Sequence, residues 1–345
     1  MRALITGITG QFSVYLAKSL LDRGYKVFGT FRRASTPNFW RIMCMGLQDK
    51  ITFVPADLID GSSLTEAIKR TEPDEVYNIG ASSYVADAFE QPIYNTEVTG
   101  LGVTKLLEAV RVINPSIKFF QMGSSEMFGN TYEGWYLNEK DQFKPASPYA
   151  AAKVYGYHMT KLYREAYGMF CVNAIIFNTE SPYRGLEFVT RKITNAVARI
   201  KLGLQKRLVL GNLAAKRDWN YVPDTVNAVL LMMLMDQPDD YVIATGDSHS
   251  VREFAEYTLH LAGLPLDLIE SDSRYLRPLD VGHLIGDATK IRELGWRPTV
   301  MFKELIEIMY KEDLSRWTSH LAGEAFPWDA PLYPNEMEIL TRCSI

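Results

Sequence analysis

Short runs rich in β-branched and aromatic residues alternate with helix-like stretches through the first half of the chain, and this alternation constrains the fold more than any other feature. Strands separated by helices of roughly 10–20 residues are typical of right-handed βαβ units in a parallel sheet. The sequence therefore predicts an α/β fold built on a doubly wound parallel sheet. The expected strands are residues 3–6, 26–31, 51–54, 75–79, 117–122 and 171–177. The expected helices are residues 13–23, 62–70, 96–112 and 148–167.

Composition excludes several classes of protein. With 345 residues, 47% of them hydrophobic and 23% charged, the chain is expected to bury a substantial core and is not disordered. The net charge of −4 gives no general attraction to nucleic acid or anionic membranes, so a phosphorylated ligand needs a local cationic site. We expect no metal site and thiols without a functional role, because the spacing of Cys44, Cys171 and Cys343 does not match that of metal ligands. The first residues resemble a strand and not a leader peptide. Apolar runs such as 228–235 are too short to span a bilayer. We therefore expect a cytoplasmic protein with no membrane or nucleic-acid partner.

A glycine-containing turn joins the first expected strand to the first expected helix. In Gly7-Ile-Thr-Gly10-Gln-Phe-Ser13, glycines stand where backbone approaches the pyrophosphate of a dinucleotide. The spacing resembles the GxxGxxG of short-chain dehydrogenases/reductases, with Ser13 in the third position, where we expect a slightly looser fit of helix on strand. The turn predicts a Rossmann-type domain with cofactor contacts from Gly7, Gly10, Gln11 and Phe12, although Phe12 is bulky for a helix turn that faces phosphates.

The end of the second expected strand indicates which dinucleotide binds. Arg32 and Arg33 follow this strand, and no acidic residue stands there to bind a ribose 2′-hydroxyl. Arginines favour a 2′-phosphate, so NADP is the expected cofactor, with two solvated loop arginines as the alternative. The other expected cofactor contacts follow the third and fourth strands: Asp57 and Leu58 near the adenine, and Ala81 and Ser83 along the inner ribose.

A tyrosine and a lysine stand one helical turn apart, after a fifth expected strand that ends in Gly123-Ser124-Ser125-Glu126. Tyr149 ionises near pH 10 in water, which is too high for a base at neutral pH. We expect Lys153 and a positive nicotinamide to lower that pKa, and Ser124 to donate a hydrogen bond to the oxygen being oxidised. Ser124, Tyr149 and Lys153 are therefore the candidate catalytic set of an oxidoreduction step, and Tyr149 and Lys153 are also expected to contact the cofactor.

Beyond residue 177 the alternation weakens, and scattered Arg, Lys, Pro and Gly separate short elements. We expect residues 1–177 to form the NADP-binding domain, with segments at about 214–250 completing its sheet. Residues 178–213 and 251–315 are expected to form a smaller C-terminal substrate-binding lobe. The last expected unit is an extended, packed tail of unknown role at 316–345, which contains Trp317, Phe326, Trp328 and Tyr333.

Longer motifs resemble those of the GDP-mannose 4,6-dehydratase family. The segment Ser124-Ser-Glu-Met-Phe-Gly129 resembles the TSEMFG motif of that family. The likeness covers about residues 1–314, and its EFVTRK and KRDW segments are more family-specific than the superfamily motifs. The other similar segments are residues 147–153, 177–182, 187–192, 216–219, 240–246, 251–254, 277–278 and 294–298.

The resemblance implies a lyase that uses NADP without net redox change. Tyr149 would take the C4-hydroxyl proton while the C4 hydride passes to NADP. Glu126 would be the acid/base specific to dehydratases: it removes the C5 hydrogen, which the 4-ketone has acidified, and the C6 hydroxyl leaves as water. The hydride then returns to C6.

The resemblance also implies a GDP-sugar substrate, GDP-D-mannose, held by residues in matching motifs. Asn178, Lys192, Arg217 and Arg277 resemble the residues that hold the nucleotide diphosphate, for which three cations suit an otherwise acidic protein. The full set of expected substrate contacts is Ser83, Ser125, Asn178, Val189, Lys192, Arg217, Arg277 and Asp280.

This sequence departs from the family pattern at several places. The family commonly has Gln-Asp-Gly at residues 11–13, His at Thr179, Gly at Asn220 and Glu at Asp280. We expect these changes to bear on the sugar that is bound more than on the fold or the chemistry.

Two other functions remain open at this point. The first is a sister enzyme on another sugar nucleotide, or a 4-dehydrogenase/reductase or epimerase; these do not need a carboxylate at Glu126. The second is a non-catalytic dinucleotide-binding protein, against which the Ser124, Tyr149 and Lys153 set argues. The resemblance further implies a homodimer or homotetramer, with helices 96–112 and 148–167 packed across a two-fold axis and the loop 32–35 joining dimers.

Overall fold

Parallel strands form the central sheet of the protein, whose computed structural model describes residues 1–276 and 278–329. Within these residues the sheet has seven strands in the order β10-β6-β5-β4-β1-β2-β3, and every neighbouring pair is parallel. The predicted doubly wound α/β fold is confirmed. The strands are β1 (Arg2–Ile5), β2 (Lys26–Phe31), β3 (Ile51–Pro55), β4 (Glu75–Asn78), β5 (Lys118–Met122), β6 (Cys171–Ile176) and β10 (Asp240–Ile243).

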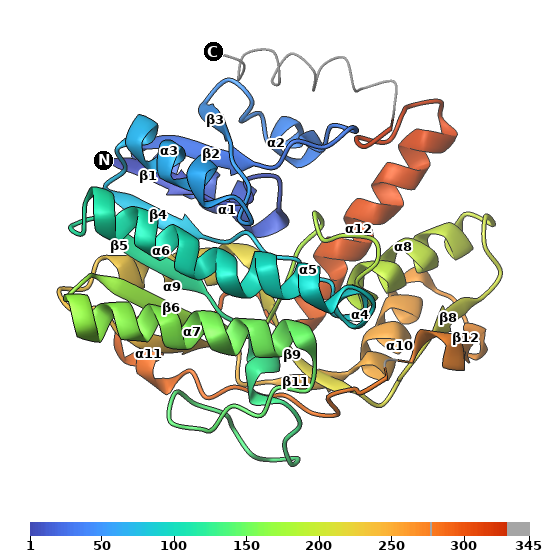
Figure 1. Cartoon of the computed structure of the whole chain (residues 1–345). Helices are drawn as coiled ribbons and strands as arrows, with labels where there is room; N and C mark the ends of the chain where they lie inside the picture. The colour runs from blue at the N-terminus through green and yellow to red at the C-terminus, as the bar shows by residue number, and fades with distance from the viewer. Residues whose placement is uncertain (277, 330–345) are drawn as a thin grey trace.

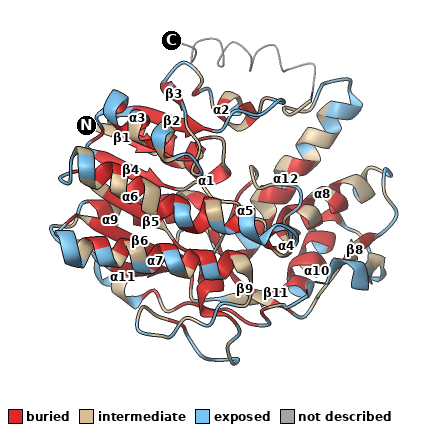
Figure 2. Ribbon diagram, viewed as in Figure 1, coloured by how far each residue is buried: buried red, intermediate tan, exposed pale blue. Residues whose placement is uncertain are grey.

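Helices cover both faces of this sheet (Figure 1). On β1, Ala3 and Ile5 belong to the core shared with α1 and α9, whereas Leu4 belongs to the core shared with α3 and α6. Side chains of a strand alternate between faces, so a sheet covered on both faces needs apolar residues at consecutive positions. Figure 2 shows the buried residues gathered on the strands and the inner sides of the helices. The flanking helices are α1 (Gln11–Asp22), α3 (Gly61–Thr71), α6 (Gly102–Ile113), α7 (Pro148–Tyr167), α9 (Val222–Met233) and α11 (Thr289–Glu293).

Helix α7 has the predicted bounds because local signals mark both of its ends. The Ser147 hydroxyl accepts a hydrogen bond from the backbone N–H of Ala150 at 3.1 Å, and Pro148 occupies the first turn, where a missing N–H costs nothing. Gly168 ends the helix in the left-handed conformation (φ 63°).

The predicted helix at residues 96–112 is interrupted. Helix α5 (Pro92–Thr96) continues through a π-helical turn (Glu97–Leu101) into α6. The interruption coincides with a close approach: a Cβ on Gly102 would lie 2.9 Å from the Cβ of Leu58. Such packing between distant segments leaves no periodic signal in the sequence.

A second group of elements lies beside the carboxyl ends of the central strands. Two small sheets, β11-β9-β7 and β12-β8, pack with α8, α10 and α12 around a separate apolar core that includes Ile193, Phe254 and Leu305. The division into a cofactor-binding domain and a substrate-binding lobe stays a prediction. The bounds are β7 (Asn178–Glu180), α8 (Val189–Lys201), β8 (Leu208–Leu210), β9 (Lys216–Tyr221), β11 (Ser248–Ser250), α10 (Val251–Ala262), β12 (Ile269–Ser271) and α12 (Phe302–Leu321), with α2 (Trp40–Cys44) and α4 (Val85–Glu90) outside this group.

The prediction of an extended tail from residue 316 is wrong for its first part, because α12 continues to Leu321. The helix is retained there because Trp317 packs against α8 and its indole N–H donates to Asn195 at 2.7 Å. The chain then returns toward α2 (Figure 1), and Tyr333 lies outside the described residues.

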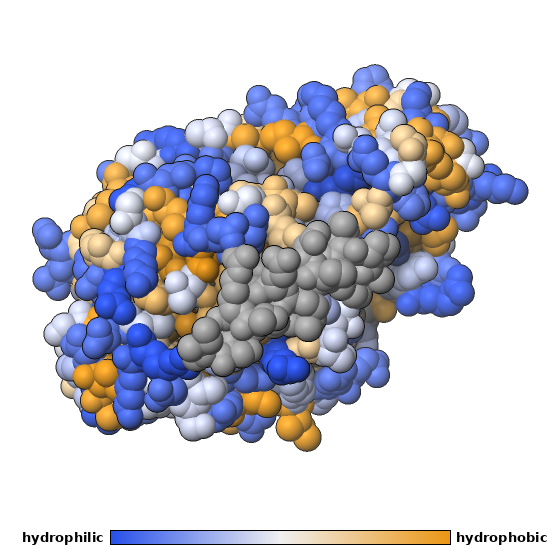
Figure 3. Space-filling model, turned by 90° about the horizontal axis from the view of Figure 1, so that it is seen from above, coloured by the Kyte–Doolittle hydropathy of each residue, from blue (hydrophilic) through white to orange (hydrophobic). Residues whose placement is uncertain are grey.

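The surface seen in Figure 3 mixes hydrophilic and hydrophobic residues. No helix in the described part of the chain combines the length and apolar character that crossing a membrane requires. Cys44 is exposed and Cys171 is buried, while Cys343 lies outside the described residues.

Candidate active site

Three adjoining cavities follow the carboxyl ends of the central strands. The central cavity, about 320 Å³, is lined by Ser124 and Tyr149; the β2 cavity, about 550 Å³, by Arg32; and the lobe cavity, about 460 Å³, by Lys192 and Arg217. The cavities share walls and therefore form one continuous cleft. The residues shared by the central and β2 cavities are Gly7, Thr9, Gly80, Ala81 and Ser83. Those shared by the central and lobe cavities are Glu126, Asn178, Arg184 and Phe188.

The glycine turn forms one wall of the central cavity. Gly7 has φ +64°, and a Cβ there would lie 2.8 Å from the Cα of Gly80, so this position requires glycine. The N–H of Gly10 donates to the carbonyl of Gly7 at 3.0 Å, and Gly10 precedes the first residue of α1. The amino end of α1 therefore opens on the cavity, an arrangement that favours an anionic group.

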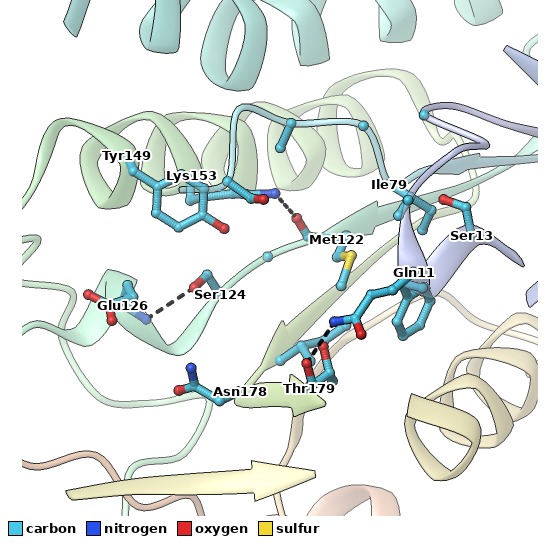
Figure 4. Close-up of a pocket in the computed structure, with 18 of the residues that line it drawn as sticks. Gln11, Ser13, Ile79, Met122, Ser124, Glu126, Tyr149, Lys153, Asn178 and Thr179 are labelled. Atoms are coloured by element: carbon cyan, nitrogen blue, oxygen red, sulfur yellow. Dashed lines mark hydrogen bonds between the residues drawn. The ribbon is translucent and has the colours of Figure 1, made fainter. Parts of the chain in front are cut away.

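Gln11 and Phe12 line the central cavity, but their side chains are committed to the protein. The Gln11 amide donates to the carbonyl of Thr179 at 2.9 Å (Figure 4). It also accepts a hydrogen bond from the Ser181 hydroxyl at 2.7 Å. Phe12 is 4% exposed and packs in the core, which explains how a bulky residue fits this turn. A phosphate in this cavity would therefore contact the backbone N–H groups of these two residues and not their side chains. Ser13 is also fully buried.

The β2 cavity contains the residues predicted to hold the adenosine end of a dinucleotide. Arg32, Asp57 and Leu58 line it together with Ala81 and Ser83. The Arg32 guanidinium donates to the hydroxyl of Tyr94 at 2.7 Å, so its direction is set by a residue that sequence reasoning missed. Arg33 is not among the lining residues of this cavity.

Ser124, Tyr149 and Lys153 meet in the central cavity (Figure 4). Helix α7 places Tyr149 and Lys153 one turn apart, and both are buried. The Lys153 ammonium donates to the carbonyl of Met122 at 2.6 Å. The hydroxyl of Ser124 accepts a hydrogen bond from the N–H of Glu126 at 3.2 Å.

Burial is the dominant influence on the pKa of both groups on α7. It raises the pKa of Tyr149 to about 12, against a smaller lowering by the hydrogen bond with Ser124. It lowers the pKa of Lys153 to about 8. With the protein groups alone the pKa of Tyr149 lies above its ordinary value, because the phenol is desolvated and the Lys153 ammonium donates to a carbonyl. The lowering expected from Lys153 together with a positive nicotinamide stays a prediction.

Glu126 lines both the central and the lobe cavity and is 8% exposed. It lies in a short 3₁₀ turn (Ser125–Phe128) that ends at Gly129, whose φ is +70°. A Cβ on Gly129 would lie 1.8 Å from the carbonyl oxygen of Lys144, so glycine is required to end this turn. The turn thus carries Glu126 past the end of β5 into the junction of the two cavities.

The lobe cavity brings together most of the residues predicted to bind substrate: Asn178, Val189, Lys192, Arg217 and Asp280. The Arg217 guanidinium lies 3.8 Å from Glu126 and 3.6 Å from Asp280. Lys192 lies over the ring of Tyr275, with its ammonium 3.5 Å from the centroid, and burial lowers its pKa.

The remaining predicted substrate contacts lie elsewhere. Ser83 and Ser125 line the central cavity and not the lobe cavity. Arg277 lies outside the described residues. Among the residues that the structure describes, no group of three or more His, Cys, Asp or Glu side chains has the geometry of a metal site.

Arg184 and Phe188 are the main residues that sequence reasoning missed. Arg184 lines the central and lobe cavities, with its guanidinium 3.5 Å from the Phe188 ring centroid and 3.2 Å from the carboxylate of Glu180. Its place two residues beyond the Asn178-Thr-Glu-Ser-Pro182 segment was the available signal.

Comparison with known proteins agrees with this geometry. The family described as GDP-mannose 4,6 dehydratase matches residues 4–309. GDP-mannose 4,6 dehydratase 2 of Arabidopsis thaliana is 48% identical over 326 residues, 90% of this chain and 86% of the relative. The Homo sapiens GDP-mannose 4,6 dehydratase is 42% identical over 340 residues, 90% of this chain and 91% of the relative. Among solved structures, the UDP-glucose 4-epimerase of Thermus thermophilus in complex with NAD has a TM-score of 0.81 at 26% identity, covering 91% of this chain and 99% of that one. The chain belongs to the GDP-mannose 4,6-dehydratase family of nicotinamide-dependent lyases.

Proposed function

We propose that the protein converts GDP-D-mannose to the GDP-4-keto-6-deoxy sugar with NADP as a tightly held cofactor. The observation that carries the proposal is the position of Glu126, a buried carboxylate at the junction of the central and lobe cavities. Oxidation at C4 alone needs no such group, whereas loss of water across C5 and C6 needs a base beside the sugar.

The residues of the cleft fit NADP. The amino end of α1 and the glycine turn suit the pyrophosphate, Arg32 suits the 2′-phosphate, and Ala81 and Ser83 suit the inner ribose. When bound, NADP supplies a hydride acceptor for C4, a hydride donor for C6 and a positive charge in the central cavity. That charge would lower the pKa of Tyr149, which burial raises.

The side chains of the central cavity handle the protons. Ser124 orients the C4 oxygen by a hydrogen bond, and Tyr149 takes the proton from that oxygen as the ketone forms. Glu126 then removes the proton at C5, and the carboxylic acid so formed protonates the C6 hydroxyl, which leaves as water. When hydride is returned to C6, C5 takes up a proton derived from solvent and the ketone at C4 remains. Lys153 fixes the end of β5 by its bond to the Met122 carbonyl and adds a positive charge near Tyr149.

The lobe cavity holds the nucleotide part of the substrate. Lys192 and Arg217 supply the positive charge that a diphosphate needs. Arg217 also lies 3.8 Å from Glu126, so the residue that binds the diphosphate adjoins the proposed base.

The test is Glu126→Gln, which keeps the shape of the side chain but cannot accept a proton. Elimination should slow by about 10²–10⁴-fold, the range typical of lost general acid–base catalysis. The first hydride transfer depends on Ser124, Tyr149 and Lys153 and should persist, so bound NADPH accumulates as nicotinamide absorbance. Glu66→Gln, an exposed position on α3, is the matched control and should behave as wild type.

A second measurement uses wild-type enzyme in heavy water, which should place solvent deuterium at C5 of the product. Normal turnover by Glu126→Gln, or a product with no label at C5, would show that the protein is not a 4,6-dehydratase. The remaining functions for this site would then be a 4-reductase or an epimerase.

A further inference from the structure

The loop from Ser181 to Phe188 joins β7 to α8 and carries Arg184 at the junction of the central and lobe cavities. The positive charge of the Arg184 guanidinium lowers the pKa of Tyr149, although burial outweighs it. Under the proposed function, the cofactor pyrophosphate lies in the central cavity and the substrate diphosphate in the lobe cavity, and Arg184 lines both. The position of Arg184 therefore depends on how firmly its loop is held.

Three consecutive carbonyls of this loop accept hydrogen bonds from three arginines of different elements, which we name the arginine clamp. The arginines come from α2, α8 and α12, which are far apart in the sequence. The bonds are Arg316 to the Pro182 carbonyl at 2.7 Å, Arg41 to the Tyr183 carbonyl at 2.8 Å and Arg191 to the Arg184 carbonyl at 2.6 Å.

The arginine clamp also contacts the glycine turn. Arg41 donates a second hydrogen bond to the carbonyl of Thr9 at 3.2 Å, and Thr9 lines the central and β2 cavities. Arg191 and Arg316 lie 3.1 and 3.3 Å from the buried carboxylate of Asp313. One set of contacts therefore joins the loop of Arg184 to the cofactor side of the cleft.

Holding three guanidinium groups close together is unfavourable without compensation. Burial, together with the positive charge of Arg191, lowers the pKa of Arg41 to about 10. The Asp313 carboxylate compensates part of this charge, and ring faces add to it, because the face of an aromatic ring is negative.

Trp328, in the segment beyond α12, supplies one such ring face. Its ring centroid lies 5.1 Å from the Arg191 guanidinium and 5.8 Å from that of Arg316. It also packs edge-to-face on Trp40 at 5.2 Å, and the Trp40 ring has Arg41 at 4.3 Å. One tryptophan of the tail thus reaches all three members of the arginine clamp, two directly and one through Trp40.

The tail segment itself is ordered by local contacts. Phe326 stacks on Trp328 with centroids 5.1 Å apart and an interplanar angle of 5°. A turn is closed by the N–H of Asp329 to the carbonyl of Phe326 at 2.9 Å and by the N–H of Phe326 to the Asp329 carboxylate at 2.8 Å.

We propose that Trp328 is a positioning residue: it holds the arginine clamp, which in turn places Arg184 for the anionic groups of the ligands. The proposal rests on the proposed function for the nature of those ligands. A simpler role, in which Trp328 only covers apolar surface and adds stability, predicts no coupling between Trp328 and Arg184. The two roles are therefore separable by experiment.

The experiment is a double-mutant cycle on NADPH binding, followed by the fluorescence of the reduced nicotinamide. Trp328→Ala should raise the dissociation constant by about tenfold, the order expected when one charge-assisted hydrogen bond is lost. Trp328→Phe keeps a ring face and should restore most of the affinity. In an Arg184→Ala background, Trp328→Ala should change the dissociation constant by less than about twofold, because its effect passes through Arg184.

Two controls keep the result interpretable. Trp135→Ala removes a tryptophan that is 56% exposed on the loop after β5, and it should leave NADPH binding unchanged. If Trp328→Ala does not fold, Trp328→Leu takes its place, since it retains apolar volume and lacks the ring face.

An unchanged dissociation constant in folded Trp328→Ala or Trp328→Leu would overturn the proposal. An equal loss of affinity with and without Arg184 would overturn it as well, because Trp328 would then act independently of that residue. Neither result depends on turnover, so a failure of the dehydratase assignment would leave this measurement readable.

Discussion

Replacing Lys153 by methionine should stabilise the nucleotide-free protein at neutral pH while removing its activity. Lys153 is 3% exposed, and burial lowers the pKa of its ammonium from 10.5 to about 8. Methionine has a similar length, is flexible and carries no charge. The Met122 carbonyl, which loses the lysine as a donor, still accepts a hydrogen bond from the Gln121 amide at 3.1 Å.

The magnitude follows from the pKa shift. Lowering the pKa from 10.5 to about 8 means that holding this ammonium in the folded protein costs about 3 kcal/mol at pH 7. Loss of a hydrogen bond from a charged donor offsets about 1.5–3 kcal/mol of that gain. The variant should therefore be more stable by up to about 1.5 kcal/mol at pH 7, although it lacks a residue of the catalytic set.

The pH dependence is the sharper part of this prediction. Between pH 8 and 10.5 the unfolded chain binds more protons at Lys153 than the folded chain does, so wild-type stability rises with pH through this window. Below pH 8 the cost of burying the charge is fully present. The advantage of the variant should consequently shrink by about 2–3 kcal/mol from pH 7 to pH 10, so that wild type becomes the more stable protein.

Urea unfolding of both proteins at pH 7 and pH 10 would measure this difference. Lys18→Met is the matched control, because Lys18 is half-exposed on α1 and pairs with Asp22 at 2.7 Å. This substitution should change the free energy of unfolding by less than about 0.5 kcal/mol. A stability difference that does not change between the two pH values, or that favours the variant more at pH 10, would refute the reasoning.

Three further predictions concern ligands and assembly. NADP should bind at least about tenfold tighter than NAD, because one charge-assisted phosphate contact is worth about 1.5–3 kcal/mol. Arg32→Ala should reduce this difference in affinity. Equal affinities of the wild-type protein for NADP and NAD in a titration would contradict the prediction. Arg217→Ala should raise the KM for the GDP-sugar strongly and leave NADP affinity unchanged, because Arg217 lines the lobe cavity and not the β2 cavity. An unchanged KM in steady-state assays would exclude a role of Arg217 in binding the diphosphate. The protein should be a homodimer or homotetramer, and light scattering that reports a monomer at micromolar concentration would disagree.

Elements whose signals are local could be predicted from the sequence. Helix α7 begins and ends as expected because Ser147, Pro148 and Gly168 act within one turn of its ends. The relative position of the candidate catalytic residues Tyr149 and Lys153 was predictable for the same reason, since they lie one turn apart on that helix. The central sheet could be predicted because its strands are runs of apolar residues, which are buried on both faces of the sheet.

Features that depend on contacts between distant segments could not be predicted. Arg41 and Arg316 hold carbonyls of residues 183 and 182, at separations of 142 and 134 residues along the chain. No periodicity or motif records such pairs. The contact of Arg32 with Tyr94 and the place of Arg184 in the cleft were missed for the same reason.

The departures from the family pattern also acquire a different meaning in three dimensions. Thr179 on β7 and Asn220 on β9 are in register in a parallel pair, so their side chains share a face. At one position the chain has a residue smaller than the histidine common in the family, and at the other a residue larger than the glycine. The two changes thus lie side by side and are opposite in size.

The positions of the departing residues indicate that they affect the binding of the dinucleotide more than the choice of sugar. Gln11 donates to the carbonyl of Thr179, and Phe12, Ser13 and Thr179 all line the central cavity. None of these three lines the lobe cavity, where Asp280 is the one departing residue among those described. The binding of a GDP-sugar thus depends on side chains that largely follow the family, whereas the substitutions surround the turn that faces the pyrophosphate. The departures therefore bear on cofactor binding more directly than on the choice of sugar, and Arg41 of α2 holds the same turn through the carbonyl of Thr9.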